Sequence, residues 1–175
     1  VIVLHNGSPV LMPWLDKAGA VLEMYLAGKA SGAAAIDLLY GKANPSGKLA
    51  ETFPLRLEDN PSYLDFPGSR DKVRYSEGIF IGYRYYDKKK MDVLFPFGYG
   101  LSYTTFRYSN MRVEVNSTIN NKSGDGLKAN DNDKIKVYID ITNTGSKAGA
   151  EIVQLYIKNF IFLENRPEKE LKNFT

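Results

Sequence analysis

The stretch that decides the fold is Leu94-Phe95-Pro96-Phe97-Gly98-Tyr99-Gly100-Leu101-Ser102-Tyr103-Thr104-Thr105-Phe106. It holds five aromatic residues, two glycines and one proline in thirteen positions. Proline and glycine interrupt helices, whereas aromatic side chains need burial and closely spaced glycines indicate tight approach of the backbone. The stretch is therefore predicted to be an ordered, aromatic-lined connector between two regions of different character.

The region before the connector alternates strand and helix patterns. Continuous apolar runs predict strands buried in a parallel sheet, and an alanine-rich segment predicts a helix that Ser31 caps and Gly41 ends. The expected elements are strands at 1–4, 20–26 and 48–53, a short helix or turn at 11–18 and a helix at 31–40. Alternation of strand and helix predicts an α/β layer fold.

The region nearer the C-terminus has a different pattern. Residues 54–74 contain three prolines and are expected to be irregular, and residues 75–87 are expected to form a strand or extended arm. After Phe106 apolar residues alternate with polar ones, which is typical of antiparallel sheets. The expected strands are 112–118, 134–142 and 151–157, with a polar loop at 119–133. Because an aligned sandwich has about seven strands, this all-β region is expected to be incomplete.

Composition excludes several classes of protein. The 175 residues are 43% hydrophobic and carry a net charge of only +3, so the chain is globular and not strongly basic. Residues 88–90 form the one basic run, which is interpreted as a solvated turn and not as a nucleic-acid patch. With no cysteine and a single histidine, His5, a disulfide, thiolate metal site or Ser-His triad is not expected. The apolar runs are too short to span a membrane, and the start at Val1 without methionine suggests a piece of a longer protein.

Six segments in sequence order resemble motifs of glycoside hydrolase family 3, the β-glucosidase and β-xylosidase type. Together they cover nearly the whole chain, and no single one would suffice. They are the strand, Asn-Gly turn and Pro-Trp of 1–14, NPSGKL (44–49) with TFP (52–54), YSEG (75–78) with GYRYYD (82–87), the connector, NTG (143–145) through QLY (154–156), and RPEKELK (166–172).

The resemblance implies a fold in two parts. Residues 1–53 would be the C-terminal part of a flavodoxin-like α/β sandwich domain, and residues 54–105 the irregular aromatic connector. Residues 106–175 would begin an immunoglobulin-like, fibronectin type III-like β-sandwich. The fold class is thus a partial α/β domain followed by a partial all-β domain.

The resemblance also implies the activity of a parent protein. The parent would be a retaining β-glucosidase that hydrolyses terminal non-reducing β-D-glucosyl residues, and this part would act as scaffold. A β-xylosidase or β-N-acetylglucosaminidase of the same family is the close alternative. A non-catalytic carbohydrate-binding module, which an exposed row of aromatic rings would favour, is the alternative from another class.

No residue of this chain is assigned a catalytic role. A retaining glycosidase needs two carboxylates about 5 Å apart. In the family the nucleophilic aspartate lies in a separate (β/α)8 barrel domain, and the acid/base glutamate of many members precedes the strand that residues 1–4 resemble. Neither motif is present here, so no catalytic residue, metal ligand or cofactor is expected.

Glu77, Arg84 and Tyr83 are the candidate substrate-binding residues within the chain. Glu77 and Asp87 lie among tyrosines and near Arg84, a setting that can tune a carboxylate for contact with sugar hydroxyls. The other interpretation, which the glycine and tyrosine content favours, is an ion pair or backbone cap that anchors the aromatic arm. The tyrosines and phenylalanines of 83–103, like Trp14, are interpreted in the same way as packing residues in preference to sugar platforms.

The partner predictions follow from the same resemblance. The expected partners are a β-glucoside or oligosaccharide substrate, bound by the parent enzyme, and the barrel domain as an intramolecular partner. Nucleic acid and membrane are not expected as partners. The oligomeric state and the compartment, cytoplasmic or secreted, are left open by the sequence.

Overall fold

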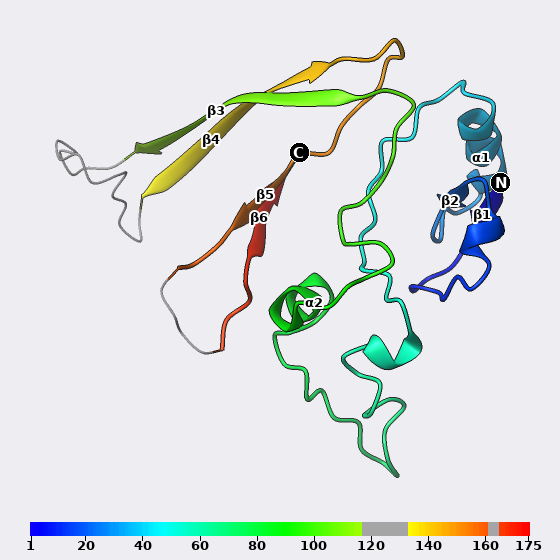
Figure 1. Ribbon diagram of the computed structural model, residues 1–175, viewed down its shortest axis with the longest axis vertical. Coiled ribbons are helices and arrows are strands. Elements are labelled where there is room, and N and C mark those ends of the chain that lie inside the picture. Colours follow the sequence, from blue (N-terminus) through cyan, green and yellow to red (C-terminus); the bar gives the residue numbers. More distant parts are fainter. Residues whose placement is uncertain (117–132, 161–164) are drawn as a thin grey trace. The chain divides into compact units, whose positions relative to one another are not determined.

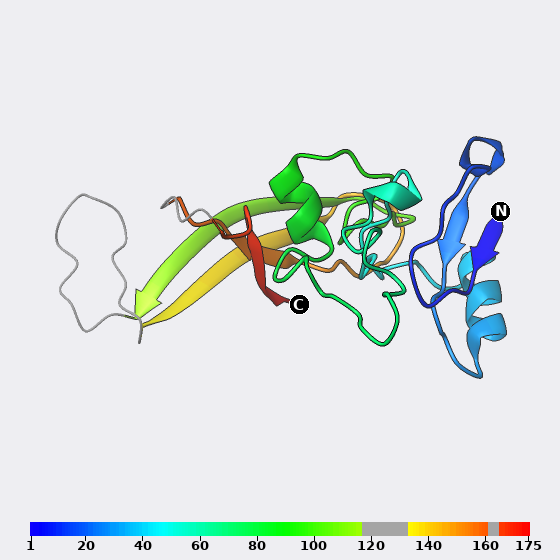
Figure 2. The same cartoon turned by 90° about the horizontal axis from the view of Figure 1, so that it is seen from below.

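The computed structural model describes residues 1–116, 133–160 and 165–175. The chain divides into two compact units, unit 1 of Val1–Ser102 with Ala150–Thr175 and unit 2 of Tyr103–Gly149. Figures 1 and 2 show the chain in two views. Among the described residues, no helix has the length and apolar character needed to cross a membrane.

Unit 1 begins with a parallel pair of short strands. Strand β1 (Ile2–Leu4) pairs with β2 (Val21–Glu23), so that Leu4 lies opposite Glu23. Between them lies the 3-10 turn η1 (Leu15–Lys17), and helix α1 (Ser31–Leu39) follows and lies beside the pair in both views (Figures 1 and 2). The predicted strand at 1–4, the parallel pairing and the helix are confirmed, whereas the strand predicted at 20–26 extends only over Val21–Glu23.

The predicted cap of α1 is wrong. Ala30 occupies the N-cap position, and no side chain caps the helix there. The turn that begins at Gly28, whose carbonyl accepts the Ser31 N–H at 3.3 Å, starts the helix one residue earlier than the serine pattern indicates. Ser31 is therefore the first helical residue, where its side chain is past the capping position.

The connector lies antiparallel to residues 49–53. The Leu49 N–H donates to the Tyr99 carbonyl at 2.8 Å, and the Phe53 N–H donates to the Phe95 carbonyl at 2.8 Å. The strand predicted at 48–53 is thus extended, but it forms only an isolated bridge between Phe53 and Phe95. Pro54 and Pro96 explain the short pairing, because proline supplies no N–H to a ladder. Phe53, at the bridge with Phe95, is fully buried.

The extended arm predicted over residues 75–87 is also wrong in part. The extended arm expected over 75–87 contains instead a helix, α2 (Tyr83–Lys89), which follows the irregular residues 54–82 and their 3-10 turn η2 (Leu57–Asp59). The tyrosine-rich composition favours a strand. However, Tyr83 and Tyr86 are three residues apart and share one helix face, which places the Tyr86 side chain in the core at 5% exposure.

The remaining strands form two antiparallel pairs. In unit 2, β3 (Phe106–Asn116) pairs with β4 (Lys134–Asn143), with an irregularity between Ser109 and Arg112. In unit 1, β5 (Gln154–Ile157) pairs with β6 (Glu170–Phe174). The antiparallel prediction is confirmed, although the first strand begins at 106 and not at 112. The end of that predicted strand, 117–118, and the predicted loop up to residue 132 lie outside the described residues.

Candidate functional site

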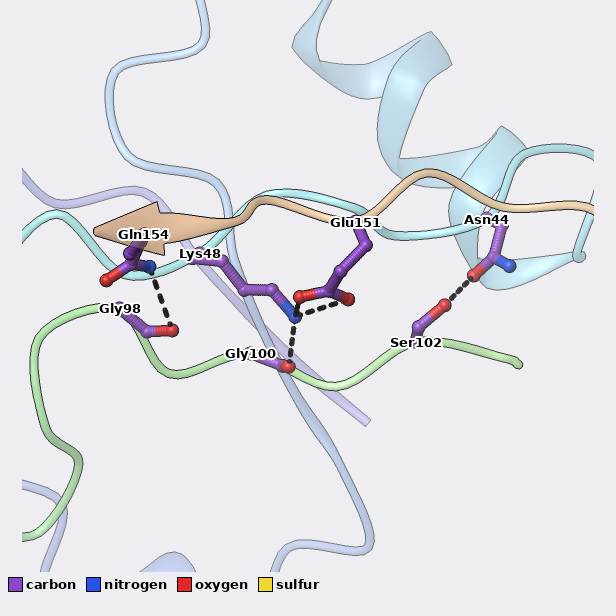
Figure 3. Close-up of polar contacts among 7 residues, drawn as sticks. All are labelled: Asn44, Lys48, Gly98, Gly100, Ser102, Glu151 and Gln154. Carbon is purple, nitrogen blue, oxygen red and sulfur yellow. Dashed lines mark hydrogen bonds and ion pairs between the residues drawn. The ribbon is translucent and has the colours of Figure 1, made fainter. Parts of the chain in front are cut away.

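Three motif segments of unit 1 meet around Lys48 (Figure 3). The Lys48 Nζ donates to the Gly100 carbonyl at 2.8 Å and forms an ion pair with the Glu151 carboxylate at 3.2 Å. The two charged side chains are only 12% and 13% exposed. A buried ion pair is tolerated where further hydrogen bonds satisfy its groups, and the Gly100 carbonyl supplies one here. We call the packed region of residues 44–54, 83–102, 151–157 and 170–171 the junction.

The two connector glycines are required by close approach at the junction. A Cβ at Gly100 would lie 2.7 Å from the Gly47 carbonyl oxygen, nearer than real Cβ atoms come. Gly98 has a φ of +80°, and a Cβ there would collide with the Gln154 side-chain amide. The Gln154 Nε2 donates to the Gly98 carbonyl at 3.4 Å (Figure 3). Glycine therefore allows the connector to pass against both neighbouring segments.

The aromatic residues of the junction pack on one another. The Tyr83 ring lies 5.1 Å from the Phe97 ring and 5.8 Å from the Tyr156 ring, measured between centroids. The Tyr83 hydroxyl accepts a hydrogen bond from the Leu171 N–H at 2.8 Å. Tyr83 thus joins α2, the connector, β5 and β6, a position that uses its ring faces and its hydroxyl in packing.

Two hydroxyl groups hold the backbone of the connector in place. The Ser102 hydroxyl donates to the Asn44 side-chain oxygen at 2.9 Å (Figure 3). The Thr52 hydroxyl, which is buried, accepts the Phe97 N–H at 3.3 Å. These bonds satisfy groups that would otherwise be costly to bury.

The sequence-predicted site residues occupy two places. Tyr83 and Arg84 are neighbours in α2, and Tyr83 lies within the junction. Glu77 is half-buried in the turn before α2, and its Oε2 atom is buried without a hydrogen-bond partner among the described residues. Asp87 pairs with Lys169 at 3.2 Å. Within the described part of the chain, no hydrogen bond or ion pair joins Glu77 to Tyr83 or Arg84.

A pair of glutamates near the end of β2 was not anticipated from the sequence. The Glu23 carboxylate accepts the Tyr25 N–H at 2.8 Å, and Tyr25 has a φ of +47°. Burial and then the Glu23 charge raise the pKa of Glu51, and burial followed by the charges of Glu51 and Glu23 raises the pKa of Tyr25. The available signal was a glutamate at the end of a predicted parallel strand, where α/β sheets gather polar groups.

Neither arrangement resembles a metal centre. Across residues 1–116, 133–160 and 165–175, no group of three histidine, cysteine, aspartate or glutamate residues is placed to hold a metal ion. In the core, burial raises the pKa of Tyr86 to about 12.

Comparisons with known proteins identify relatives across the whole chain. The family model described as "Glycosyl hydrolase family 3 C-terminal domain" matches residues 1–103. Thermostable beta-glucosidase B of Acetivibrio thermocellus is 55% identical over 99% of this chain and 22% of its own length. Probable beta-glucosidase I of Emericella nidulans is 48% identical over 99% of this chain and 20% of its own length.

Solved structures agree with these relatives. The beta-glucosidase from Kluyveromyces marxianus matches with a TM-score of 0.84 and 43% identity, over 100% of this chain and 19% of that one. The Bifidobacterium adolescentis GH3 beta-glucosidase matches with a TM-score of 0.85 and 41% identity, over 99% and 24%. The chain spans about a fifth of the length of the curated relatives that it matches.

Proposed function

The chain belongs to glycosyl hydrolase family 3, and from this premise we propose that it is a structural segment of a retaining β-glucosidase. The complete enzyme would hydrolyse terminal non-reducing β-D-glucosyl residues. Its two catalytic carboxylates would lie in parts of the relatives' length that this chain does not span. The support is that the similar proteins are named β-glucosidases and that the chain spans about a fifth of them.

The observation that carries the scaffold role is the junction. Its polar groups and aromatic rings are engaged with one another: Lys48 with Gly100 and Glu151, and Tyr83 with Phe97 and the Leu171 N–H. A side chain committed to such contacts has little capacity left to bind a sugar. The motif residues would therefore brace the enzyme in preference to contacting its substrate.

The finer description of the fold is also a proposal. Residues 1–53 would end a flavodoxin-like α/β sandwich, residues 54–105 would be the connector, and residues 106–175 would begin a fibronectin type III-like sandwich. The parallel β1–β2 pair with α1 supports the first assignment, and the two antiparallel pairs support the last. The sheet of the α/β sandwich and the β-sandwich would both be completed by strands outside this chain.

The intramolecular partner would be the barrel domain. Residues 54–82 carry large apolar side chains that are exposed, among them Leu64 at 92%, Tyr75 at 81% and Phe66 at 76%. Exposed apolar surface of this kind marks an interaction face. Packing of this segment against the barrel would remove it from water. Of the three candidates for a direct contact with sugar, Glu77 and Arg84 stay proposed, whereas Tyr83 is engaged in the packing of the junction.

The test is hydrolysis by the complete polypeptide that contains this chain. It would be assayed with the 4-nitrophenyl glycosides of β-D-glucose, β-D-xylose and N-acetyl-β-D-glucosamine. We expect the highest kcat/KM on the glucoside and no turnover by the 175-residue chain alone. Preference for the xyloside or the glucosaminide would instead support the close alternatives, and no turnover of any glycoside would reject the proposal.

A further inference from the structure

A basic surface lies in unit 1 where the end of α2 meets the β5–β6 pair. Among the described residues it holds seven cations, Arg84, Lys88, Lys90, Lys158, Arg166, Lys169 and Lys172, and three carboxylates, Asp87, Glu168 and Glu170. Lys158 together with Lys88 and Lys90 lowers the pKa of Glu168. Within the described part of this surface, the seven cations exceed the three carboxylates by four, and an excess of this sign attracts anions.

A cleft of about 490 Å³ opens on this surface beside Phe160. The Phe160 ring is 81% exposed, and the Lys158 Nζ lies 5.8 Å from its centroid. Arg166, also exposed, lines the same cleft. A second cleft of about 360 Å³ is lined by Lys90, Lys169 and the same Lys158. The two clefts meet at Lys158, and we call them together the basic groove.

The charges of the basic groove are only partly neutralised within the protein. Lys158 pairs with Glu168 at 3.1 Å, Lys169 with Asp87 at 3.2 Å, and Lys172 with Glu170. Each of these pairs engages one carboxylate, so the three acids are taken up by three lysines. Among the described residues, Arg166 has no ion pair, although it lines the larger cleft next to the exposed ring.

An anion with an apolar face fits this arrangement. A guanidinium group binds a carboxylate through two parallel hydrogen bonds, and the C–H face of a sugar ring can leave water by covering an aromatic ring. We propose that the basic groove binds an acidic oligosaccharide, with one sugar ring on Phe160 and its uronate carboxylate on Arg166. This site is separate from the proposed function, since it needs no glucosidase turnover.

Two other ligands fit less well. A neutral glucan would make no use of the excess cations. A single-stranded nucleic acid stacks successive bases on several aromatic rings, whereas Phe160 is the one aromatic residue among the described residues that line the larger cleft.

The test is a titration of the 175-residue chain with tetragalacturonate at fixed salt, in which calorimetry measures the affinity. We expect saturable binding that weakens about tenfold, or 1.4 kcal/mol, in Phe160→Ala and in Arg166→Ala. Arg166→Lys should lose part of the affinity, because lysine keeps the charge but not the two-point contact. Phe66→Ala, at a ring that is 76% exposed elsewhere, and Arg70→Ala serve as matched controls and should bind as the unaltered chain does.

Several results would overturn the inference. These are no saturable binding of tetragalacturonate, equal binding of neutral cellotetraose, or equal losses in the Phe66 and Arg70 controls. Tighter binding of octathymidylate that does not depend on Phe160 would show a nucleic-acid surface instead. Because Phe160 and Arg166 are exposed, their variants should keep the far-ultraviolet circular dichroism of the unaltered chain.

Discussion

Lys48 places its ammonium group between the Gly100 carbonyl and the Glu151 carboxylate, and its side chain is almost covered. Desolvating an ammonium group costs several kcal/mol unless a partner charge and hydrogen bonds compensate it. The pair joins residues 103 positions apart in the sequence. Its role is therefore to hold two distant segments of unit 1 together.

Removing one charge of the Lys48–Glu151 pair should strongly lower the stability of the fold. We predict that Glu151→Gln lowers the free energy of unfolding by about 3 kcal/mol, because Lys48 is left charged and buried. Urea denaturation measures this change. The control is Asp37→Asn, which breaks an exposed pair with Lys42 at 70% and 50% exposure and should cost less than about 1 kcal/mol. Equal effects of the two variants would contradict the assigned role.

The Glu23 and Glu51 pair predicts a pH dependence of stability. Because burial and then the Glu23 charge raise the pKa of Glu51, folding favours its protonated form. This contribution is fully present below the unfolded pKa of about 4.3 and is lost as the pH rises through the raised folded pKa. We predict that Glu51→Gln unfolds at higher urea than the unaltered chain at pH 7, with a smaller difference at pH 4. Exposed Glu58→Gln is the control, and parallel pH profiles for Glu51→Gln and the unaltered chain would reject the account.

At the scale of elements, periodicity predicted β1, β2, α1, β3, β4 and β5, but it gave no strand at β6, the partner of β5. It failed at α2, where composition favoured a strand and packing of Tyr86 decided for a helix. Local patterns indicate which residues will be buried. Whether those residues are buried on a helix or on a strand depends on their tertiary neighbours. The cap at Ala30 was missed for a similar reason, since the turn from Gly28 sets where α1 starts.

The connector offers a direct test of its glycines. We predict that Gly98→Ala destabilises the chain by more than about 2 kcal/mol, because alanine resists the left-handed backbone and its Cβ meets Gln154. Gly28→Ala has a similar φ of +72° but free space around its Cβ, and should cost only about 1 kcal/mol. Adding Gln154→Ala should recover part of the loss in Gly98→Ala. Failure of that recovery, seen by thermal denaturation, would count against the steric explanation.

Tyr83 connects α2, the connector, β5 and β6, so its packing role can be tested by stability, without sugar. We predict that Tyr83→Phe lowers the free energy of unfolding by about 1 kcal/mol, because the Leu171 N–H loses its acceptor. Tyr75→Phe, at a side chain that is 81% exposed, should change stability far less. Unchanged stability in Tyr83→Phe would contradict the packing role that we assign to Tyr83 in the junction.

At the scale of the whole molecule, the chain spans about a fifth of relatives named β-glucosidases. The family could be predicted because six short motifs occur in sequence order. In the connector motif, for example, Gly98 and Gly100 leave the space that Gln154 and Gly47 occupy. The Lys48–Glu151 contact could not be predicted, because nothing local in sequence indicates which charges meet across 103 positions. Arg166 belongs to the RPEKELK motif, but its place beside Phe160 on one cleft could not be predicted, since it depends on the fold of β5 and β6.

The central claim is that this chain braces a β-glucosidase and supplies no catalytic carboxylate. It is tested most directly by kcat for 4-nitrophenyl β-D-glucoside, measured for the complete polypeptide and for its Glu77→Gln variant. We predict turnover by the unaltered polypeptide and a kcat within about threefold of it for the variant, since removal of a catalytic group costs about 10⁴-fold or more. A loss of that size in Glu77→Gln, or no turnover by the unaltered polypeptide, would contradict the claim.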